Sequence, residues 1–522
     1  MGKFEIENKR WVFPLCQYYK LVNEISRMNA TQPANSTFSL TPVPENVFKV
    51  LKNDPSVSTL NHTKAKMLLE ALPLTISKKL LPFQREGVLF GLAREGRVLI
   101  GDEMGLGKTV QAIAIAAAYL DEWPLLIVCP SSMRCMWAQE LVNWLPGELT
   151  PQDVNTIFSG RDVVGNQLVT IISYDLFCKF APEISSMQFK VIIGDESHYL
   201  KNPNAKRSKT ILPFIRSARR SILLTGTPAL SRPVELFNLL NSLHPRLFNN
   251  FLEFAYRYCD AHQGPFGLET SGASNLEELH VLLDQHTMVR RLKKDVLTQL
   301  PAKRRQKILI KISEAESKRF ATEMDKLKEL ERVTQDEEED SEARFRAQSR
   351  KKALIMKMYV DTGVAKLQAI QEYVADLIEC GAKFLVFAHH MEILDGLEDV
   401  VSKKKVQYIR IDGSTPSRER QLRVSSFQES SSVRVAILSV TAAGTGLTLT
   451  AANLVVFAEL HWTPGILLQA EDRAHRIGQQ SSVNVMYLVG QGTCDELIWD
   501  SISYKVKVIG RALDGMRTSF NA

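Results

Sequence analysis

The sequence predicts an α/β protein built from two parallel-sheet lobes, with a helical insertion between them and a small amino-terminal accessory element. Short apolar runs alternate with amphipathic stretches over residues 80–240, which is typical of a parallel sheet wrapped by helices. The alternation breaks down over residues 240–360 and returns after residue 380. A chain of 522 residues is long enough for about two to four domains, each with its own core.

The apolar runs give the expected strands in order. In the first lobe they are residues 98–100, 125–128, 169–172, 191–193 and 222–224, and in the second lobe residues 384–387, 406–411, 435–438, 454–457 and 483–488. Each run is short and bounded by polar stretches, as expected of strands that are buried on both faces. An acidic run at residues 336–342 predicts a solvated loop or helix end.

The first 75 residues differ from the rest. Aromatic residues gather near the start, at Trp11, Phe13, Tyr18 and Tyr19, and a stretch rich in Ser, Thr, Pro and Asn follows at residues 29–45. This change of composition predicts an accessory element followed by a linker. The expected division of the chain is accessory element 1–50, linker 51–75, first lobe 76–240, helical extension and hinge 241–360, second lobe 361–515 and tail 516–522.

Composition excludes few classes of protein by itself. Hydrophobic residues make up 45% and charged residues 24%, which are ordinary globular values. The net charge of +7 favours a polyanionic partner only mildly, because it is spread over a long chain. The seven cysteines form no Cys-x-x-Cys pair, which favours a reducing compartment. No signal-peptide core or membrane-length apolar stretch is visible, so we expect a soluble intracellular protein without a membrane partner.

Residues 102–109, DEMGLGKT, have the features of a phosphate-binding loop. They follow a strand-like run and precede a segment that can continue as a helix, which is the order such a loop requires. Gly105 and Gly107 let the backbone curl around phosphate oxygens, while Lys108 supplies a cation and Thr109 a hydroxyl for Mg²⁺. The strict pattern has glycine where this chain has Asp102, so a tight turn before a core helix is the alternative for this loop alone.

An acidic motif, DESH, follows at residues 195–198. The apolar run before it predicts a buried strand that delivers Asp195 and Glu196 to its carboxyl end, where ligands of parallel sheets lie. We expect Asp195 to hold Mg²⁺ and Glu196 to deprotonate the attacking water. Two adjacent acids also occur in solvated turns, but the strand before them and His198 after them favour a catalytic role.

Residues 469–479 read QAEDRAHRIGQ and place Arg473 and Arg476 three positions apart. On a helix this spacing puts both arginines on one face. A planar guanidinium suits the charge on a transferring phosphoryl group, and its supply from the second lobe would make hydrolysis depend on closure of the lobes. An exposed helix with surface salt bridges is the alternative interpretation.

Together with further segments, these motifs resemble those of helicase superfamily two, and their sequences are similar to those of the Swi/Snf-type DNA translocases. The resemblance covers about residues 80–515 and implies two RecA-like lobes. An aspartate at the position of Asp102 is what this family uses. The further segments are residues 81–87 (LPFQREG), 129–132 (CPSS) with Trp137, 172–174 (ISY), 224–228 (LTGTP), 290–296 (RRLKKDV), 384–390 (FLVFAHH), 411–414 (IDGS) and 441–449 (TAAGTGLTL).

Within that family, the chain is similar to the annealing-helicase branch, also called HepA-related proteins. The similarity rests on residues 123–126 (WPLL), 384–390, 457–460 (FAEL) and 469–479. Residues 11–15 (WVFPL), with Tyr18 and Leu21, are similar to the end of the HARP domain that precedes the motor in this branch. An aromatic strand or helix packed on the motor is the alternative for these amino-terminal residues.

The resemblance implies a role for individual residues. The implied ATP-binding residues are Gln84, which reads adenine, and Asp102, Glu103, Met104, Gly105, Leu106, Gly107, Lys108 and Thr109. The implied catalytic residues are Lys108, Asp195, Glu196, Arg473 and Arg476, and the implied Mg²⁺ ligands are Thr109 and Asp195. The residues expected to couple the lobes are His198, Thr225, Gly446 and Gln469. The expected DNA contacts are Ser131, Ser132, Thr441, Thr445 and Trp462.

The densest basic stretch lies in the expected hinge region. Its members are Arg290, Arg291, Lys293, Lys294, Lys303, Arg304, Arg305 and Lys307. Such a cluster can brace the two lobes or contact the phosphates of DNA. The sequence leaves both interpretations open.

The resemblance implies an ATP- and Mg²⁺-dependent annealing helicase that moves along duplex DNA, rewinds complementary strands and remodels stalled replication forks in the nucleus. Its expected partner is forked or junction DNA, bound independently of sequence. No motif that would recruit a single-strand DNA-binding protein is visible in the sequence. The alternatives are a nucleosome or protein–DNA remodelling ATPase, a non-hydrolysing scaffold and an RNA-unwinding enzyme. The intact catalytic set argues against a scaffold, and the DESH motif against RNA unwinding.

Overall fold

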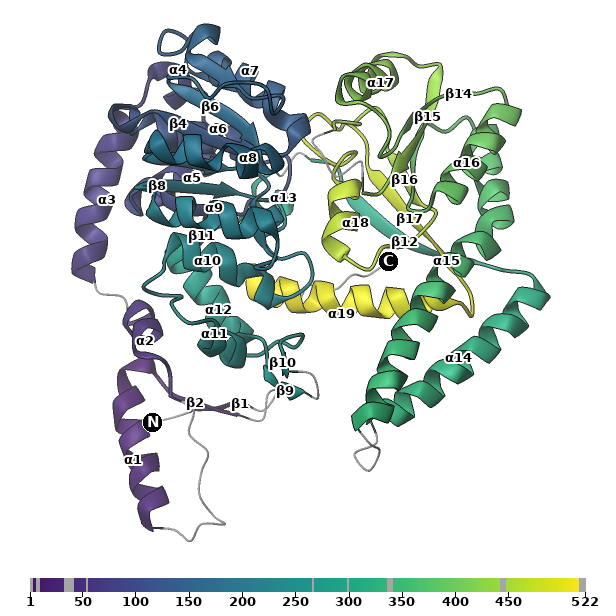
Figure 1. Cartoon of the computed structure of the whole chain (residues 1–522), viewed down its shortest axis with the longest axis horizontal. Helices are drawn as coiled ribbons and strands as arrows, with labels where there is room; N and C mark the ends of the chain where they lie inside the picture. The colour runs from purple at the N-terminus through teal and green to yellow at the C-terminus, as the bar shows by residue number, and fades with distance from the viewer. Residues whose placement is uncertain are drawn as a thin grey trace.

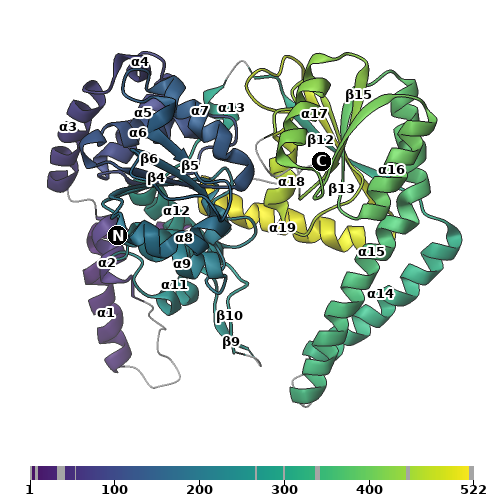
Figure 2. The ribbon, with the colours of Figure 1, turned by 45° about the horizontal axis from the view of Figure 1, so that its top comes forward.

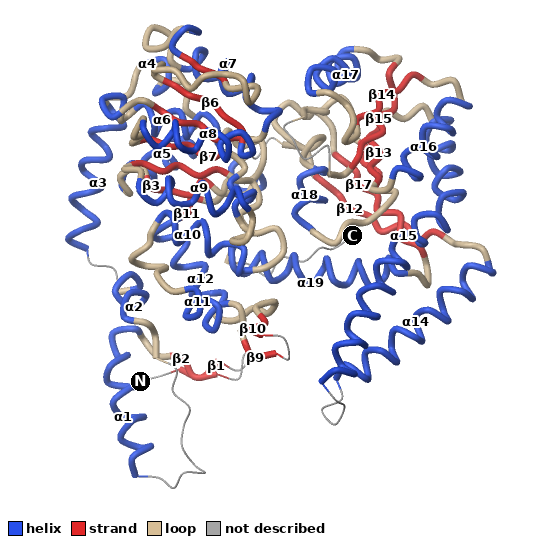
Figure 3. The backbone as a smooth tube through the Cα atoms, viewed as in Figure 1, coloured by secondary structure: helices blue, strands red, loops and turns tan. Residues whose placement is uncertain are grey.

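The computed structural model describes residues 3–5, 10–31, 42–52, 55–264, 267–297, 300–335, 341–441 and 447–515. Two lobes, each with strands inside and helices outside, lie side by side above a shared helix, α19 (Cys494–Asp514) (Figure 1). Colouring by secondary structure shows the same layering in both lobes (Figure 3). The predicted α/β architecture with two parallel-sheet lobes is therefore confirmed.

The first lobe is built on a seven-stranded parallel sheet with the strand order β11-β3-β8-β7-β4-β6-β5. Because the strands are parallel, their carboxyl ends share one edge, where the loops carrying the predicted motifs begin. The strands are β3 (Arg97–Ile100), β4 (Leu125–Cys129), β5 (Val154–Thr156), β6 (Val169–Ser173), β7 (Val191–Gly194), β8 (Arg220–Leu224) and β11 (Met288–Val289). The covering helices are α5 (Pro82–Ala93), α6 (Lys108–Ala117), α7 (Arg134–Trp144), α8 (Tyr174–Ser186), α9 (Lys206–Ser217) and α10 (Phe237–Leu243).

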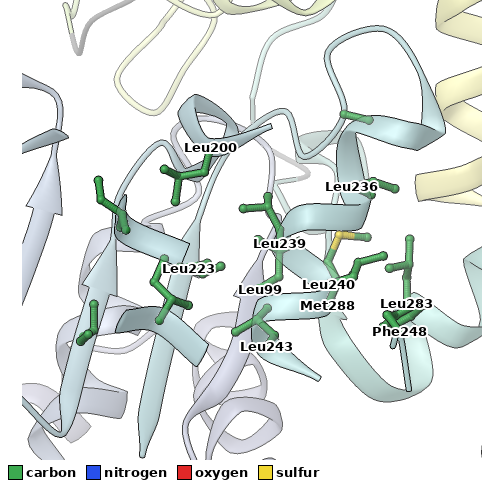
Figure 4. Close-up of a cluster of buried hydrophobic side chains, with 14 of the residues drawn as sticks. Leu99, Leu200, Leu223, Leu236, Leu239, Leu240, Leu243, Phe248, Leu283 and Met288 are labelled. Carbon is green, nitrogen blue, oxygen red and sulfur yellow. The ribbon is translucent and has the colours of Figure 1, made fainter. Parts of the chain in front are cut away.

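Both faces of this sheet are buried. Successive residues of β3 point to opposite faces, so that Leu99 packs into one apolar cluster while Val98 and Ile100 pack into another. Figure 4 shows the first cluster, in which Leu99 and Leu223 lie near Leu239 of α10. Double burial explains why the strands of this lobe read as continuous apolar runs rather than as alternating ones.

The second lobe contains a six-stranded parallel sheet with the strand order β12-β17-β16-β13-β15-β14. Apolar clusters again cover both of its faces. Its strands are β12 (Lys303–Ile310), β13 (Phe384–Ala388), β14 (Gln407–Ile411), β15 (Val433–Ser439), β16 (Leu454–Phe457) and β17 (Val483–Gly490). Its helices include α15 (Ser341–Glu379), α16 (Met391–Lys403), α17 (Ser417–Glu429) and α18 (Pro464–Glu471).

Every apolar run that was expected to form a strand lies in one, apart from Val406, which immediately precedes β14. The structure adds β5, β11 and β12 to the two large sheets. β5 and β11 span only three and two residues, and β12 reads KRRQKILI, whose charges are tolerated because it is an edge strand. The middle of the chain therefore contributes a strand to each lobe: β11 is an edge strand of the first sheet and β12 an edge strand of the second.

The rest of the middle segment is helical, as expected. Two long helices, α14 (Glu314–Gln335) and α15, form a hairpin that projects from the second lobe in both ribbon views (Figures 1 and 2). Residues 336–340 of the acidic run lie outside the described residues. α15 is 39 residues long, yet among the described helices none is both long and apolar enough to cross a membrane. The smaller elements are α11 (Phe251–Tyr258), β9 (His262–Gly264), β10 (Gly267–Glu269), α12 (Leu276–Leu282) and α13 (Lys293–Val296).

Helix α19 joins the two lobes. It follows β17 of the second lobe, and its last turns pack on α12 of the first lobe. Leu513 is buried in the core of the first lobe, and its carbonyl oxygen lies 3.1 Å from Nδ1 of His280. Asp514 accepts a 2.5 Å hydrogen bond from Nε of Arg290. Residues 494–514, which the expected division assigned to the second lobe, are thus anchored in both lobes.

The amino-terminal element contains a hairpin of β1 (Lys3–Glu5) and β2 (Arg10–Val12), followed by α1 (Tyr18–Thr31) and α2 (Glu45–Leu51). Three aromatic rings, those of Tyr18, Tyr19 and Phe48, pack together with centroids 4.8 to 5.3 Å apart. Most of the segment that was expected to be a linker forms α3 (Pro55–Glu70) and α4 (Leu74–Ser77). Ala65 and Leu69 of α3 are buried in the core of the first lobe, so this segment is part of the packed structure.

A buried ion pair ties three parts of the second lobe together. Nζ of Lys366 in α15 donates to Oδ2 of Asp495 at 2.6 Å and to the carbonyl oxygens of Ala458 and Leu488 at 2.9 Å. Since both side chains are almost fully buried, removal of one partner leaves an uncompensated charge.

We expect Lys366→Ala to lower the free energy of unfolding by about 3–5 kcal/mol, measured by urea denaturation. The matched control is Lys318→Ala, whose pair with Glu314 is exposed on α14 and which should change stability by less than about 0.5 kcal/mol. A loss below about 1 kcal/mol for Lys366→Ala would contradict a structural role for the pair.

Candidate nucleotide site between the lobes

The predicted phosphate-binding loop lies between β3 and α6, at the carboxyl edge of the first sheet. Gly105 has a φ angle of 88° and Gly107 one of 77°, values that disfavour any residue with a Cβ. Gly107 immediately precedes α6, so the first N–H groups of that helix and its positive dipole end lie at the loop. The loop therefore has the backbone geometry that binds an anion.

Lys108 supplies the positive charge of this loop. Its Nζ donates to the carbonyl oxygen of Asp102 at 3.0 Å. Burial lowers the pKa of Lys108, against the opposing effect of the nearby carboxylates, of which Glu196 acts most strongly. A buried ammonium close to a loop of N–H donors is suited to bind a phosphate ligand.

The acids at the start of the loop are held by residues from other segments. Asp102 is fully buried, and its Oδ2 accepts hydrogen bonds from Gln111 at 2.8 Å and from Arg291 at 3.3 Å. Oδ1 of Asp102 accepts no hydrogen bond from any described residue. Glu103 accepts a 2.7 Å hydrogen bond from the backbone N–H of Lys293. The loop is thereby fastened to the segment that follows β11.

The remaining residues expected to bind ATP surround the same loop. Gln84 is buried, and its Nε2 donates to the carbonyl oxygen of Leu106 at 3.0 Å while its Oε1 accepts from the N–H of Leu81 at 3.0 Å. Met104 covers Gly226, where an added Cβ would lie 2.4 Å from Met104 Cγ. Thr109 lies in the first turn of α6. All residues of this predicted set are therefore brought together at one loop.

The two acids of the DESH motif follow β7 directly, as expected. Asp195 is buried, and its carboxylate accepts hydrogen bonds from the indole N–H of Trp137 at 2.8 Å and from the N–H of Glu196 at 2.9 Å. The hydroxyl of Tyr174 donates to the carbonyl oxygen of Asp195 at 2.6 Å. Burial, followed by the negative charge of Glu196, raises the pKa of Asp195.

Glu196 has a different environment. Its φ angle of 50° is left-handed, which is unfavourable for a residue with a side chain and marks a constrained position. Burial alone would raise the pKa of Glu196, but the neighbouring His198 and the charges of Lys108 and Arg473 outweigh it, so the pKa is lowered. Oε2 of Glu196 lies 3.2 Å from Nδ1 of His198, and this contact is one of the interactions that lower the pKa of Glu196. The side chain is thus held as a carboxylate beside His198.

The arginines of the second lobe reach this site, although not on a helical face. α18 ends at Glu471, and Arg473 and Arg476 lie in the turns that follow, where the carbonyl oxygen of Arg473 accepts a hydrogen bond from the N–H of Leu449. The expectation of one helical face was wrong, because the chain leaves the helix to pair with residues 447–449. Burial of Arg473 also excludes the alternative of an exposed salt-bridged helix.

Both arginines lie in a turn beside the first lobe. Burial lowers the pKa of Arg473 to about 10, with the charge of Glu196 acting in the opposite direction. Arg476 donates to Oγ1 of Thr448 at 2.8 Å, and its Cβ lies 3.1 Å from where a Cβ on Gly105 would be. The turn that carries the arginines therefore packs against the phosphate-binding loop itself.

The residues expected to couple the lobes form a continuous chain through one residue that the sequence analysis did not assign. Nδ1 of His198 lies 3.1 Å from Oγ1 of Thr225, which accepts a hydrogen bond from the N–H of Thr227 at 3.2 Å. Oγ1 of Thr227 accepts a 2.9 Å hydrogen bond from Gln469 of α18. This chain leads from beside Glu196 into the second lobe. Gly446, the fourth expected member, lies outside the described residues.

Three residues of the basic stretch brace the second-lobe turn. Nζ of Lys293 lies 2.9 Å from Oδ1 of Asp472 and donates to the carbonyl oxygen of His475 at 2.5 Å. Lys303 lies 2.8 Å from Glu471, and Arg305 makes a two-fold contact with Glu471 at 2.6 and 2.8 Å. Lys293 therefore braces the lobes, whereas Lys303 and Arg305, which lie in β12 of the second sheet, hold the turn within its own lobe. Lys294 and Arg304 are exposed.

The expected DNA contacts lie on both lobes. Ser131 is exposed in the turn before α7, whereas the hydroxyl of Ser132 is buried without a hydrogen-bond partner among the described residues. Thr441 is exposed after β15, with its hydroxyl 3.2 Å from that of Ser439. The indole of Trp462 packs edge-on against Tyr359, with ring centroids 5.9 Å apart. Thr445 lies outside the described residues.

Sequence reasoning missed Thr227, and it gave no catalytic role to Trp137 or Lys293. Trp137 and Thr227 lie in segments whose sequences resemble motifs of the family, so this resemblance could have identified them. The position of Lys293 depends on acids that are distant in sequence, and no local pattern reveals such a pairing.

A phosphate-binding loop and an acidic pair on one parallel-sheet lobe, completed by arginines from a second such lobe, define a two-lobed P-loop nucleotide-binding motor. The profile of the SNF2-related domain matches residues 83–358, and that of the helicase conserved C-terminal domain matches residues 365–478. The chain belongs to the SNF2-related family within helicase superfamily two.

Curated relatives agree with this assignment. A Xenopus laevis protein named SWI/SNF-related matrix-associated actin-dependent regulator of chromatin subfamily A-like protein 1 is 44% identical, with 98% of this chain and 51% of that protein aligned. The Mus musculus DNA annealing helicase and endonuclease ZRANB3 is 46% identical over 90% of this chain and 44% of its own length. The chain thus spans about half the length of these relatives. A Caenorhabditis elegans homologue of the first protein is 39% identical, with 92% and 69% aligned.

Among solved structures, the Sulfolobus solfataricus SWI2/SNF2 ATPase core in complex with dsDNA matches with a TM-score of 0.39 and 23% identity. The match covers 81% of this chain and 90% of that chain.

The buried acid Glu471 predicts a pH-dependent stability. Burial would raise its pKa, but the charges of Arg305 and Lys303 outweigh burial and hold the pKa well below its ordinary value of about 4.3. A carboxyl with a lowered pKa in the folded state stabilises the fold above its unfolded pKa, and this stabilisation is lost as the pH falls below about 4.3.

We expect Glu471→Gln to lower the free energy of unfolding by about 3–5 kcal/mol at pH 7, because it removes the carboxylate charge that faces the two buried cations Lys303 and Arg305. The difference in Tm between wild type and variant should shrink as the pH falls below about 4, as measured by differential scanning calorimetry. Glu329→Gln, on an exposed position of α14, is the control. A difference in Tm that is independent of pH would contradict the ion-pair assignment.

Proposed function

We propose that this protein is a DNA-dependent ATPase of the annealing-helicase type, which hydrolyses ATP on DNA with single-to-double-strand junctions and rewinds the complementary strands. The observation that carries the proposal is the contact between the second-lobe turn of Arg473 and Arg476 and the phosphate-binding loop of the first lobe. Turnover at such a site depends on how the lobes meet, which is what a translocating motor requires. The name of the mouse relative, a DNA annealing helicase, supports the annealing activity.

The residues at the loop fit a nucleotide triphosphate with Mg²⁺. The N–H groups of residues 105–109 and the ammonium of Lys108 would hold the phosphates, and Thr109 and Asp195 would hold the metal ion. Bound Mg²⁺ neutralises charge on the phosphate oxygens and orients the transferring group. Gln84, at the edge of the loop, would read the adenine base.

Glu196 is the proposed general base. Its lowered pKa keeps the carboxylate ionised at neutral pH, so it can take the proton of an attacking water. Arg473 and Arg476 would stabilise the negative charge that develops on the transferring phosphoryl group. Both arginines remain charged near neutral pH, since even the pKa of the fully buried Arg473 is about 10.

The hydrogen-bond chain from His198 through Thr225 and Thr227 to Gln469 is the proposed link between chemistry and motion. It begins beside the proposed base and ends on the helix that leads into the arginine turn. A change at Glu196 during hydrolysis can therefore alter a contact between the lobes. Gly446 is a proposed further member on the basis of the family resemblance.

DNA is the proposed track of the motor, and the nucleus its proposed location. The proposed contacts are Ser131, Ser132, Thr441, Thr445 and Trp462. Hydroxyl and backbone contacts to phosphate read no sequence, as translocation along any duplex requires. Since the hydroxyl of Ser132 is buried here, its contact requires a local rearrangement. Fork remodelling and recruitment by a single-strand DNA-binding protein follow from the branch resemblance alone.

A second candidate is a nucleosome or protein–DNA remodelling ATPase. The name of the frog relative, a regulator of chromatin, favours this second function. The two functions share the motor and differ in the substrate that stimulates it, so a comparison of substrates separates them.

The test is steady-state ATP hydrolysis with no nucleic acid, single-stranded DNA, duplex DNA, forked DNA and structured RNA. We expect the strongest stimulation with forked DNA, and strand rewinding in a subsequent annealing assay. Equal stimulation by plain duplex would favour the remodeller, and no hydrolysis with any substrate would contradict both.

The matched variants in this test are Lys108→Ala and Lys209→Ala. The first removes the loop cation and should abolish turnover while leaving binding of forked DNA largely intact. The second removes an exposed lysine of α9 and should leave turnover unchanged. Normal turnover in Lys108→Ala would overturn the assignment of the nucleotide site.

A further inference from the structure

Arg290 joins three separate parts of the structure through one guanidinium group. Its Nε donates to Oδ1 of Asp514, in the last turn of α19, at 2.5 Å. Its Nη1 donates to the carbonyl oxygen of Gly101 at 2.7 Å and to that of Gly226 at 3.3 Å. A single side chain thus connects the end of α19 with the start of the phosphate-binding loop and with the segment after β8.

The carbonyl group of Gly101 belongs to the peptide that opens the phosphate-binding loop. The N–H of Gly101 donates to the carbonyl oxygen of Val289 at 2.8 Å, so hydrogen bonds hold this residue on both sides. The next carbonyl oxygen, that of Asp102, accepts the 3.0 Å hydrogen bond from Nζ of Lys108. The orientation of the peptide between residues 101 and 102 therefore influences where the ammonium of the loop lies.

Gly226, the second carbonyl partner, lies against the same loop. A Cβ added to Gly226 would lie 2.4 Å from Cγ of Met104 and 3.4 Å from Nζ of Lys108. Both carbonyl groups that the guanidinium holds therefore border residues that are expected to bind phosphate.

Asp514 is the acid that pairs with this guanidinium. Only 13% of the Arg290 side chain and 11% of the Asp514 side chain is exposed, so the loss of the carboxylate leaves a cation with little access to solvent. A charge-assisted hydrogen bond is also stronger than one to a neutral carbonyl. Asp514 therefore fixes the direction in which Arg290 presents Nη1.

We propose that Asp514 is a positioning residue for the nucleotide site: through Arg290 it holds the start of the phosphate-binding loop in the orientation that receives phosphate. This role rests on the proposed binding of ATP at that loop. Because α19 follows β17 of the second lobe, a movement of that lobe that withdraws Asp514 lowers the affinity of the loop for ATP. Since coupling between two sites is reciprocal, bound nucleotide in turn stabilises the packing of α19 on the first lobe.

The first test titrates the full chain with Mg²⁺ and adenylyl imidodiphosphate, a non-hydrolysable ATP analogue, by isothermal titration calorimetry. We expect Asp514→Asn to raise the Kd about three- to tenfold, the worth of one hydrogen bond. In hydrolysis on forked DNA, KM for ATP should rise similarly while kcat stays close to the wild-type value, because the proposed base and the two arginines of the second lobe are unchanged. Asp500→Asn, at an exposed position of the same helix, is the matched control and should alter neither constant.

An ATP affinity of Asp514→Asn equal to that of the wild type overturns the proposal, as does a fall in kcat alone. If the wild type itself does not bind the analogue, the proposed function falls together with this role. If the wild type binds it and Asp514→Asn binds it equally well, only the role of Asp514 falls.

A double-mutant cycle tests the route through Arg290. Arg290→Gln should lower the affinity for the analogue at least as much as Asp514→Asn, and the double variant should bind it no more weakly than Arg290→Gln alone. Losses that multiply in the double variant overturn the route.

Hydrogen exchange tests the reciprocal effect. The analogue should slow amide exchange in residues 505–514 of the wild type, and this slowing should be absent in Asp514→Asn. Equal slowing in both proteins overturns the coupling, because a contact that only supports the fold does not make the end of α19 respond to nucleotide.

Discussion

The structure depends on the burial of two adjacent acids, Glu471 and Asp472, at the point where α18 ends. Carboxylates that are removed from solvent in this way are stable only if cations accompany them, and here Lys293, Lys303 and Arg305 do so. The arginine turn begins at the next residue. The ion cluster therefore fixes where Arg473 and Arg476 emerge, and with it the distance between the second lobe and the phosphate-binding loop.

Lys293 connects this ion cluster to the first lobe. Its ammonium contacts Asp472 of the second lobe, while its backbone N–H holds Glu103 of the phosphate-binding loop. One residue thus connects the loop that would bind phosphate with the turn that would stabilise the transferring group. Helix α19 provides a second connection, through the hydrogen bond from Arg290 to Asp514.

Much of the fold could be predicted from the sequence, because double burial turns the central strands into apolar runs that are easy to recognise. β12 was missed since its charged residues resemble a loop, although they pair with acids of α18 in the folded chain. The placement of Arg473 and Arg476 on a helical face failed for a tertiary reason: the chain leaves the helix after Glu471 to pair with residues near Leu449. The helical spacing of residues in a sequence does not reveal such a tertiary contact.

The positions of the proposed nucleotide-site residues in the fold were predictable, because the parts of this site are local. Gly105, Gly107 and Lys108 lie in or beside one short loop, and the DESH acids follow one strand. The basic stretch was not predictable in the same way. Arg305 and Glu471, for example, are 166 residues apart in sequence, so only the folded structure shows that they pair with one another.

The central claim is that a second-lobe arginine completes the nucleotide site of the first lobe. The most direct measurement compares Arg476→Ala with Arg304→Ala, an exposed member of the same basic stretch, for ATP affinity and for hydrolysis on forked DNA. The account predicts that Arg476→Ala lowers the hydrolysis rate by about 10³ or more while ATP affinity stays nearly unchanged, and that Arg304→Ala alters neither. A variant at Arg476 that loses only ATP affinity, at an unchanged maximal rate, would contradict the account.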